Sequence, residues 1–242
     1  MNLFKKLFFI LLLLPLATFA QESKGTLLNI SEITVKPGQD AQFNEGVKLW
    51  KECYVKHHGT DHWNIWHRVQ GIGNVYVLAG PMEKWADMDK KDTSGDACNK
   101  TVRDFIMPHI EKVDYNIAQS IPEFSRETLK DTKLIWVTFF KIKNTPDFMD
   151  AVKGLNAAIK TTEGSYRWYF YKIMGGSPET ADYFFTQPYK GFADLDNDQS
   201  SVWKVYEKVN GAKATDAIRT KIRNAITLNW SYLYTLSEDL SN

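Results

Sequence analysis

The sequence is poor in cysteine, has no surplus of charge of one sign, and has no long apolar run beyond its first residues. Its 30 basic and 29 acidic side chains leave a formal net charge of +1 over 242 residues. No basic block follows the first residues, so the electrostatic footprint of a nucleic-acid-binding protein is missing. No run reaches the roughly 20 apolar residues that a membrane-spanning helix needs. We therefore expect no nucleic-acid partner and no membrane attachment of the mature chain.

The first twenty residues have the pattern of a cleavable signal peptide. Lys5 and Lys6 precede an apolar stretch from Leu7 to Leu16, and small residues follow it up to Ala20. A positive start, a short apolar stretch and a small-residue end are typical of export signals. We expect cleavage near Ala20-Gln21 and a periplasmic or secreted soluble protein, with residues 1–20 taking no part in the fold. An uncleaved N-terminal anchor is the alternative.

Aromatic residues are abundant, and the chain repeats itself. It contains eight Trp, eleven Tyr and fourteen Phe, most of which a core must hold. The segment Trp85-Ala86-Asp87-Met88-Asp89 resembles Phe192-Ala193-Asp194-Leu195-Asp196. Strand-like segments precede both at the same offset, Glu32–Lys36 in the first half and Phe139–Lys143 in the second. A repeat of this length indicates two similar structural units.

Each half shows the pattern strand, helix, strand, strand, helix, strand. In the first half we expect strands at 26–35, 62–70, 75–79 and 115–121, with helices at 39–56 and 97–113. In the second half we expect strands at 133–142, 165–174, 182–186 and 227–236, with helices at 144–160 and 200–226. This β-α-β-β-α-β order is that of a ferredoxin-like unit, whose helices cover one face of the sheet. We predict an α+β protein with a first unit at 26–121, a polar linker at 122–131 and a second unit at 132–236.

The repeated order, and the short segments beginning at Trp85 and Phe192, resemble the dimeric α+β barrel superfamily. That group includes antibiotic-biosynthesis monooxygenases, NIPSNAP-like proteins, and haem-binding chlorite dismutases and dye-decolourising peroxidases. The resemblance implies that the two tandem units cover each other's bare sheet faces, forming a pseudo-dimeric barrel within one chain. Helices would then lie outside and aromatic side chains inside. Fold alone does not carry a function.

The same resemblance bears on the two cysteines. In a ferredoxin-like unit the two helices lie side by side and antiparallel. Cys53 falls near the end of the first expected helix and Cys98 near the start of the second. The resemblance therefore favours a Cys53–Cys98 disulfide, which an exported protein can keep. Two buried thiols are the alternative.

All the histidines lie in the first half, and they do not have the spacing of a metal site. They are His57, His58, His62, His67 and His109. His62 and His67 are five positions apart on one expected strand, so their side chains face opposite sides. No cysteine or carboxylate completes a zinc spacing. We expect no metal and no cofactor, and haem finds no histidine in the second half to serve as an axial ligand.

Alternation along the strands suggests a barrel interior with mostly aromatic walls and a few polar groups. The residues expected to face inward are Glu32, His62, Trp66, Arg68, Trp168, Lys172, Trp230 and Tyr232. Walls of this kind suit a small organic ligand. Arg68 would pair with a ligand carboxylate, and His62 would act as a general base near neutral pH. The alternative is an interior filled by its own aromatic rings, with Arg68 paired to Glu32.

Two functions remain open from the sequence. The first is binding of a small organic ligand by a protein without catalytic activity. The second, which the resemblance suggests, is a cofactor-independent monooxygenase acting on an aromatic substrate. A cavity inside the barrel would favour either of them over a purely structural role.

Overall fold

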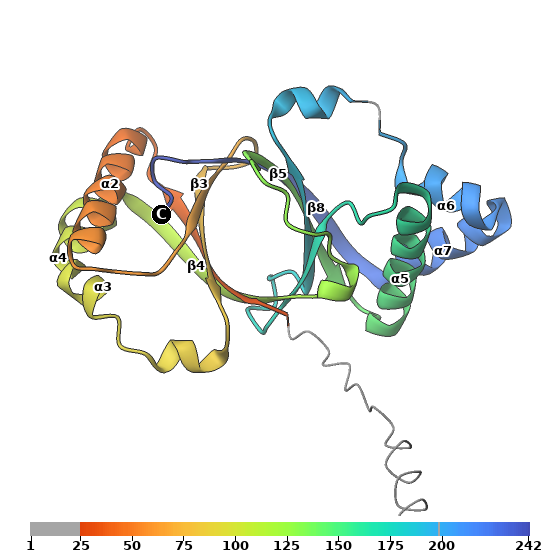
Figure 1. Cartoon of the computed structure of the whole chain (residues 1–242), viewed down its shortest axis with the longest axis horizontal. Coiled ribbons are helices and arrows are strands. Elements are labelled where there is room, and N and C mark those ends of the chain that lie inside the picture. The colour runs from red at the N-terminus through yellow and green to blue at the C-terminus, as the bar shows by residue number, and fades with distance from the viewer. Residues whose placement is uncertain (1–24, 198) are drawn as a thin grey trace, which may run out of the picture.

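The computed structural model describes residues 25–197 and 199–242, so the expected signal peptide lies outside the described residues. The strands close into one barrel in the order β1-β3-β2-β8-β5-β7-β6-β4, and every neighbouring pair is antiparallel (Figure 1). The strands are β1 (Leu27–Val35), β2 (Asn64–Arg68), β3 (Asn74–Met82), β4 (Ile110–Ser120), β5 (Leu134–Ile142), β6 (Tyr169–Ile173), β7 (Tyr183–Tyr189) and β8 (Ile226–Leu236). A closed barrel leaves no strand edge unpaired.

The helices lie outside the barrel on two opposite sides, as expected (Figure 1). On one side are α2 (Asp40–Lys56), α3 (Thr93–Ala97) and α4 (Asn99–Thr101). On the other side are α5 (Thr145–Glu163), α6 (Val202–Asn210) and α7 (Ala212–Ala225). In the part of the chain that the structure describes, none of these helices has the length and apolarity required to cross a membrane.

Each half of the chain supplies four consecutive strands of the barrel. The first half contributes β4-β1-β3-β2 and the second β8-β5-β7-β6. The halves meet at two short seams. At one, β2 pairs with β8 from Trp66–Leu236 to Arg68–Tyr234. At the other, β4 pairs with β6 from Ala118–Ile173 to Ser120–Tyr171.

Side-chain alternation divides the core into an interior layer and an outer layer under the helices. On β1, Leu28 and Ile30 pack inside the barrel. Ile33 and Val35, on the other face of the same strand, pack under α2 against Phe43. Successive strand residues point to opposite faces, so one strand can serve both layers. Only the side chains on the inward face of each strand therefore reach the barrel interior.

The Cys53–Cys98 disulfide predicted from the resemblance is confirmed. It joins the last turns of α2 to the junction of α3 and α4, with a Cα–Cα distance of 5.9 Å. In the chain-entropy model, closing a loop of this length stabilises the fold by about 4 kcal/mol. The bond therefore fixes the helical layer of the first half.

The continuous helix expected at 97–113 is wrong. Helical structure continues beyond α4 only as a π-helical turn at Val102–Ile106 and a 3₁₀ turn at Met107–His109. Pro108 removes a backbone donor and disfavours continuation. From Ile110 onward the chain pairs with β1, starting opposite Val35. Ladder hydrogen bonds to β1 thus outweigh the helical periodicity of this segment, and β4 begins five residues before the strand start expected at Tyr115.

Candidate functional site

The barrel encloses a cavity of about 870 Å³, so the interior is not filled by its own side chains. Its walls come from both halves of the chain, and most of them are apolar or aromatic. Wall residues include Ile30, Val77, Phe139, Tyr171, Ile173 and Phe184. Ligand pockets of roughly 300–1,000 Å³ with apolar walls and a few polar groups are typical of small-molecule sites. The cavity therefore has the size and lining of a ligand site.

The linker expected at 122–131 contributes to the wall of this cavity. Several of its residues line the cavity, from Pro122 to Leu129. The hydroxyl of Tyr169, which also lines the cavity, accepts a hydrogen bond from the Leu129 amide at 2.7 Å. The same hydroxyl donates to the Glu127 carbonyl at 3.2 Å. The linker is thus fastened to β6, and it forms part of the cavity wall.

Glu32 is a carboxyl group on the cavity wall. It projects from β1 and lines the cavity together with Tyr234 of β8. Burial raises the pKa of Glu32, and the nearby Arg68 guanidinium opposes that shift in part. A carboxyl group with a raised pKa in an apolar site is suited to exchange protons with a bound molecule.

Tyr234 offers a hydrogen-bond donor that nothing in the described chain uses. Its side chain is only 2% exposed, and its hydroxyl has no hydrogen-bond partner among the described residues. Burial raises the pKa of this hydroxyl and the negative charge of Glu32 adds to the shift, while the Arg68 guanidinium close to the hydroxyl oxygen opposes it in part, so the hydroxyl stays protonated at neutral pH. An unpartnered buried hydroxyl is costly, and because this oxygen has almost no accessible surface, a bound molecule can reach it only after the side chain turns toward the cavity.

Arg68, expected to line the interior, is not among the residues that line the cavity. Its guanidinium stacks over the Tyr232 ring, 4.6 Å from the centroid, and donates to the Ile72 carbonyl of the β2–β3 hairpin. Its buried Nε has no partner among the described residues. The ion pair with Glu32 offered as an alternative is not formed: no Glu32–Arg68 contact within 4.0 Å occurs in the described structure. Arg68 therefore acts on Glu32 through its charge alone.

The other expected site residues divide into two groups. Trp66 lines the cavity, as Glu32 does. Tyr232 and Trp230 lie with Phe139, which lines the cavity: the Trp230 ring stacks on the Phe139 ring at a centroid distance of 5.4 Å, and Tyr232 meets it edge-on at 6.4 Å. These side chains support the wall without lining the cavity.

The inward placement expected for His62, Trp168 and Lys172 is wrong. His62 is exposed and precedes β2, which begins at Asn64, so it cannot be the general base inside the barrel. Trp168 is buried in the outer layer, where its ring stacks on Phe185. Lys172 is exposed. The inward face of β6 is the opposite one, which carries Tyr169, Tyr171 and Ile173.

Sequence reasoning missed several wall residues, and a usable signal existed for one of them. Tyr234 shares its strand face with Tyr232, so a period of two would have included it. Phe139 and Phe184 are opposite each other in the β5–β7 ladder and lie in the interior cluster. Their burial could not be assigned to the inside or the outside from an aromatic-rich strand alone.

The histidines lie away from the cavity wall. The His67 ring, for instance, stacks on the Tyr76 ring with 4.4 Å between centroids, on the helix-covered side of the sheet. Its Nε2 atom is hydrogen-bonded to Asn74 Oδ1 at 2.7 Å. The cavity lining contains no histidine, cysteine or methionine. Since these are the axial ligands of most haem proteins, the residues present do not fit the haem found in some superfamily members.

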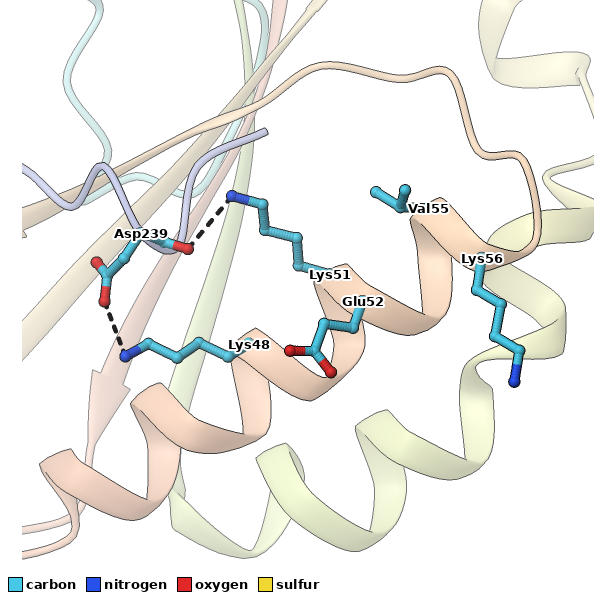
Figure 2. Close-up of a pocket in the computed structure, with 6 residues that line it drawn as sticks. All are labelled: Lys48, Lys51, Glu52, Val55, Lys56 and Asp239. Carbon is cyan, nitrogen blue, oxygen red and sulfur yellow. Dashed lines mark hydrogen bonds and ion pairs between the residues drawn. The ribbon is translucent and has the colours of Figure 1, made fainter.

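A second hollow lies outside the barrel, between α2 and the C-terminal tail (Figure 2). Lys48 pairs with the Asp239 carboxylate at 2.9 Å, and Lys51 donates to the Asp239 carbonyl at 3.3 Å. The tail is anchored next to these contacts, because Leu240 is 1% exposed and its carbonyl accepts from Trp63 Nε1 at 3.0 Å. Exposed ion pairs contribute little, so this hollow is best understood as the place where the tail docks.

Comparisons by sequence give no relatives. No protein-family model matches the chain, and no curated protein matches it either. Information about its relationships therefore comes from the fold.

Solved structures with the same fold are numerous. An anthrone oxidase-like protein matches with a TM-score of 0.56 at 10% identity, covering 90% of this chain and 93% of the other. A Lactobacillus acidophilus NCFM protein, named only provisionally as a monooxygenase, matches with a TM-score of 0.54 at 9% identity, covering 90% and 98%. Chlorite dismutase from Candidatus Nitrospira defluvii, solved in complex with imidazole, matches with a TM-score of 0.53 at 9% identity, covering 90% and 94%. At these identities the likeness establishes the fold alone. The chain thus has the closed α+β barrel fold of these solved structures.

Proposed function

We propose that this protein binds a small, largely apolar aromatic ligand inside its barrel. The observation that carries the proposal is the cavity of about 870 Å³, whose largely apolar walls also carry the Glu32 carboxyl. Aromatic rings of the ligand would pack against Phe139 and Phe184. A polar atom at its leading end would accept a hydrogen bond from Tyr234 once that side chain turns toward the cavity. The apolar walls supply affinity, and the two polar groups fix orientation.

A fluorescent aromatic amine, 1-aminoanthracene, tests the proposal. Its emission rises in apolar surroundings, so binding is followed by titration. Ala79 lines the cavity, and Ala79→Trp would fill part of the space the probe needs. We expect this variant to bind the probe at least 10-fold more weakly than the wild-type protein. The matched control is Ala157→Trp on the exposed face of α5, which should leave the affinity unchanged. Equal affinity of the two variants, or no binding to the wild-type protein, would contradict the proposal.

A second candidate function is favoured by the position of Glu32. The fold neighbours include proteins named as an anthrone oxidase-like protein and as a provisional monooxygenase. In such a reaction an aromatic ketone with an acidic CH₂ group would react with dioxygen, and CH₂ plus O₂ would give C=O plus H₂O. Glu32 would accept the first proton from carbon, and Tyr234 would donate a hydrogen bond to the ketone oxygen as negative charge develops there. Oxygen uptake with anthrone as substrate tests this. Glu32→Gln should abolish the uptake while keeping probe affinity within about twofold, and unchanged uptake would exclude Glu32 as the base.

We further propose that the chain is exported and that its halves are tandem ferredoxin-like units derived by duplication. The Cys53–Cys98 disulfide supports export, because disulfides persist in oxidising compartments. The identical strand order of the two halves supports duplication. Sequencing the N-terminus of protein recovered from the periplasm or the medium tests the export proposal. Cleavage should leave Gln21 as the first residue, and a chain beginning at Met1 would contradict it.

A further inference from the structure

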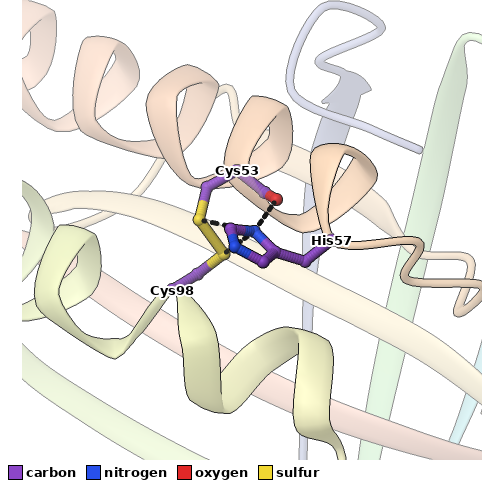
Figure 3. Close-up of side chains that lie close together, drawn as sticks. All are labelled: Cys53, His57 and Cys98. Carbon is purple, nitrogen blue, oxygen red and sulfur yellow. Dashed lines mark hydrogen bonds between the residues drawn. A yellow bond between two sulfur atoms is a disulfide. The ribbon is translucent and has the colours of Figure 1, made fainter.

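Outside the barrel, three potential metal ligands lie together where the end of α2 meets α4 (Figure 3). They are Cys53, Cys98 and His57, and their ligand atoms all lie within 4.8 Å of one another. His57 follows Cys53 by one helical turn, so its ring folds back over the disulfide. Its Nδ1 atom lies 3.6 Å from Cys53 Sγ and 3.9 Å from Cys98 Sγ. In the disulfide form the sulfurs are bonded to each other and cannot act as thiolate ligands.

We propose that reduction of this disulfide converts the cluster into a binding site for Zn²⁺. In a tetrahedral zinc site, with Zn–S near 2.3 Å and Zn–N near 2.0–2.1 Å, sulfur and nitrogen ligands stand about 3.6 Å apart. The His57 nitrogen is already at this separation from Cys53 Sγ and within a few tenths of an ångström of it from Cys98 Sγ. The two sulfurs must move from bonding distance to about 3.8 Å, and the His57 ring must turn its Nδ1 atom from the Cys53 carbonyl toward them; side-chain rotation can supply both changes.

The surroundings suit an ion that enters from solvent and is then shielded on one side. Cys98 is fully buried, Cys53 is half-buried and His57 is exposed. The fourth coordination position would face solvent and hold water. At present Nδ1 of His57 donates its proton to the Cys53 carbonyl at 2.9 Å, so binding requires the tautomer with the proton on Nε2. Imidazole and thiolate ligands together are a donor set that zinc prefers.

The chemistry has two balanced steps. A dithiol or phosphine reductant supplies two electrons, two protons are taken up, and the disulfide becomes two thiols. Zn²⁺ then binds both sulfurs and releases two protons. In an oxidising compartment the chain holds a disulfide, and in a reducing one the same residues hold a metal. This inference does not depend on the cavity or its ligand.

Cobalt titration of the phosphine-reduced protein tests the proposal, since Co²⁺ bound by thiolates gives a charge-transfer absorption band that Zn²⁺ then displaces. We expect one ion per reduced chain and none on the oxidised protein. His57→Ala should weaken binding at least 10-fold. His58→Ala is the matched control, because His58 is an exposed neighbour outside the cluster, and it should bind like the wild-type protein.

Two results would overturn the proposal. One is the absence of the thiolate–cobalt band from reduced wild-type protein. The other is equal affinity of the His57→Ala and His58→Ala variants. A reduced chain that unfolds would give this second result as well, because its thiolates would bind cobalt without His57 held in place. Unfolding on reduction would therefore also count against the proposal. Near-ultraviolet circular dichroism of each reduced sample identifies that case.

Discussion

Two tyrosines of nearly equal burial allow the unpartnered hydroxyl in the barrel to be tested. Tyr234 is 2% exposed and Tyr76 is 3% exposed. The Tyr76 hydroxyl donates to the Asp40 carboxylate at 2.5 Å, whereas the Tyr234 hydroxyl has no partner among the described residues. Replacing either by Phe keeps the ring and removes only the hydroxyl. The two substitutions should therefore change stability in opposite directions.

The magnitudes follow from the hydrogen bonds. A buried polar group without a partner costs about 1–3 kcal/mol, so Tyr234→Phe should raise the free energy of unfolding by about 1 kcal/mol. Hydrogen bonds to charged groups contribute about 1.5–3 kcal/mol, so Tyr76→Phe should lower it by about 2 kcal/mol. Urea denaturation of ligand-free protein at pH 7 measures both. A loss of stability in Tyr234→Phe comparable to that in Tyr76→Phe would refute the argument, since the Tyr234 hydroxyl would then have a partner in the free protein.

The same substitution should have the opposite effect on ligand binding. A ligand oxygen that accepts from Tyr234 loses one hydrogen bond in Tyr234→Phe, which corresponds to an affinity about 2- to 10-fold weaker. Tyr76 faces the outer layer under α2, so Tyr76→Phe should not change affinity. Isothermal titration with a ligand that carries a carbonyl oxygen separates these effects. Higher stability combined with weaker binding would mark Tyr234 as a binding residue.

Three further predictions concern the cavity, the tail and the linker. The pKa of Glu32 is raised above its ordinary value of 4.5, so the folded protein holds this proton more tightly than the unfolded chain does. The free energy of unfolding should therefore fall as the pH rises from the ordinary pKa to the raised one. Glu32→Gln should be more stable than wild-type protein at pH 7 and similar to it below pH ~4 in thermal unfolding, whereas lower stability at pH 7 would contradict the burial argument. Leu240 is 1% exposed, so Leu240→Ala should lower the free energy of unfolding in urea by about 2–5 kcal/mol. Leu228 is 57% exposed, so Leu228→Ala should lower it by under ~0.5 kcal/mol. Equal losses would mean that the tail does not dock as described. Tyr169→Phe removes both hydrogen bonds of its hydroxyl to the linker, so trypsin should cleave after Lys130 faster, and an unchanged rate would show that other contacts hold the linker.

The outer helices could be predicted because they follow from element order, and the barrel and the disulfide because the resemblance that this order carries implied them. Once strands and helices alternate as they do here, the helices must cover one sheet face, and the other face must be covered by something apolar. The polar composition of 122–131 likewise indicated a connecting segment. Its place on the cavity wall depends on the Tyr169 hydroxyl, which is distant in the sequence. Such a contact is set by barrel closure and leaves no local pattern.

The errors have local physical causes. β6 and the residue before it carry aromatic side chains on both faces, Trp168 and Phe170 toward the helices and Tyr169 and Tyr171 toward the cavity. Because both faces are buried, hydrophobic alternation cannot distinguish inside from outside. His62 was misplaced because β2 starts two residues later than expected, at Asn64. A side chain beyond the end of a strand is not bound by the alternation of that strand.

The central claim is that the barrel interior is the ligand site, and methyl NMR tests it most directly. Adding 1-aminoanthracene to methyl-labelled protein should shift signals of cavity residues such as Ile30, Val77 and Ile173. Signals of Val205 and Ile218, which pack among the helices on the outside, should stay in place. Shifts confined to Val205 and Ile218, or no saturable shifts inside the barrel, would contradict the account.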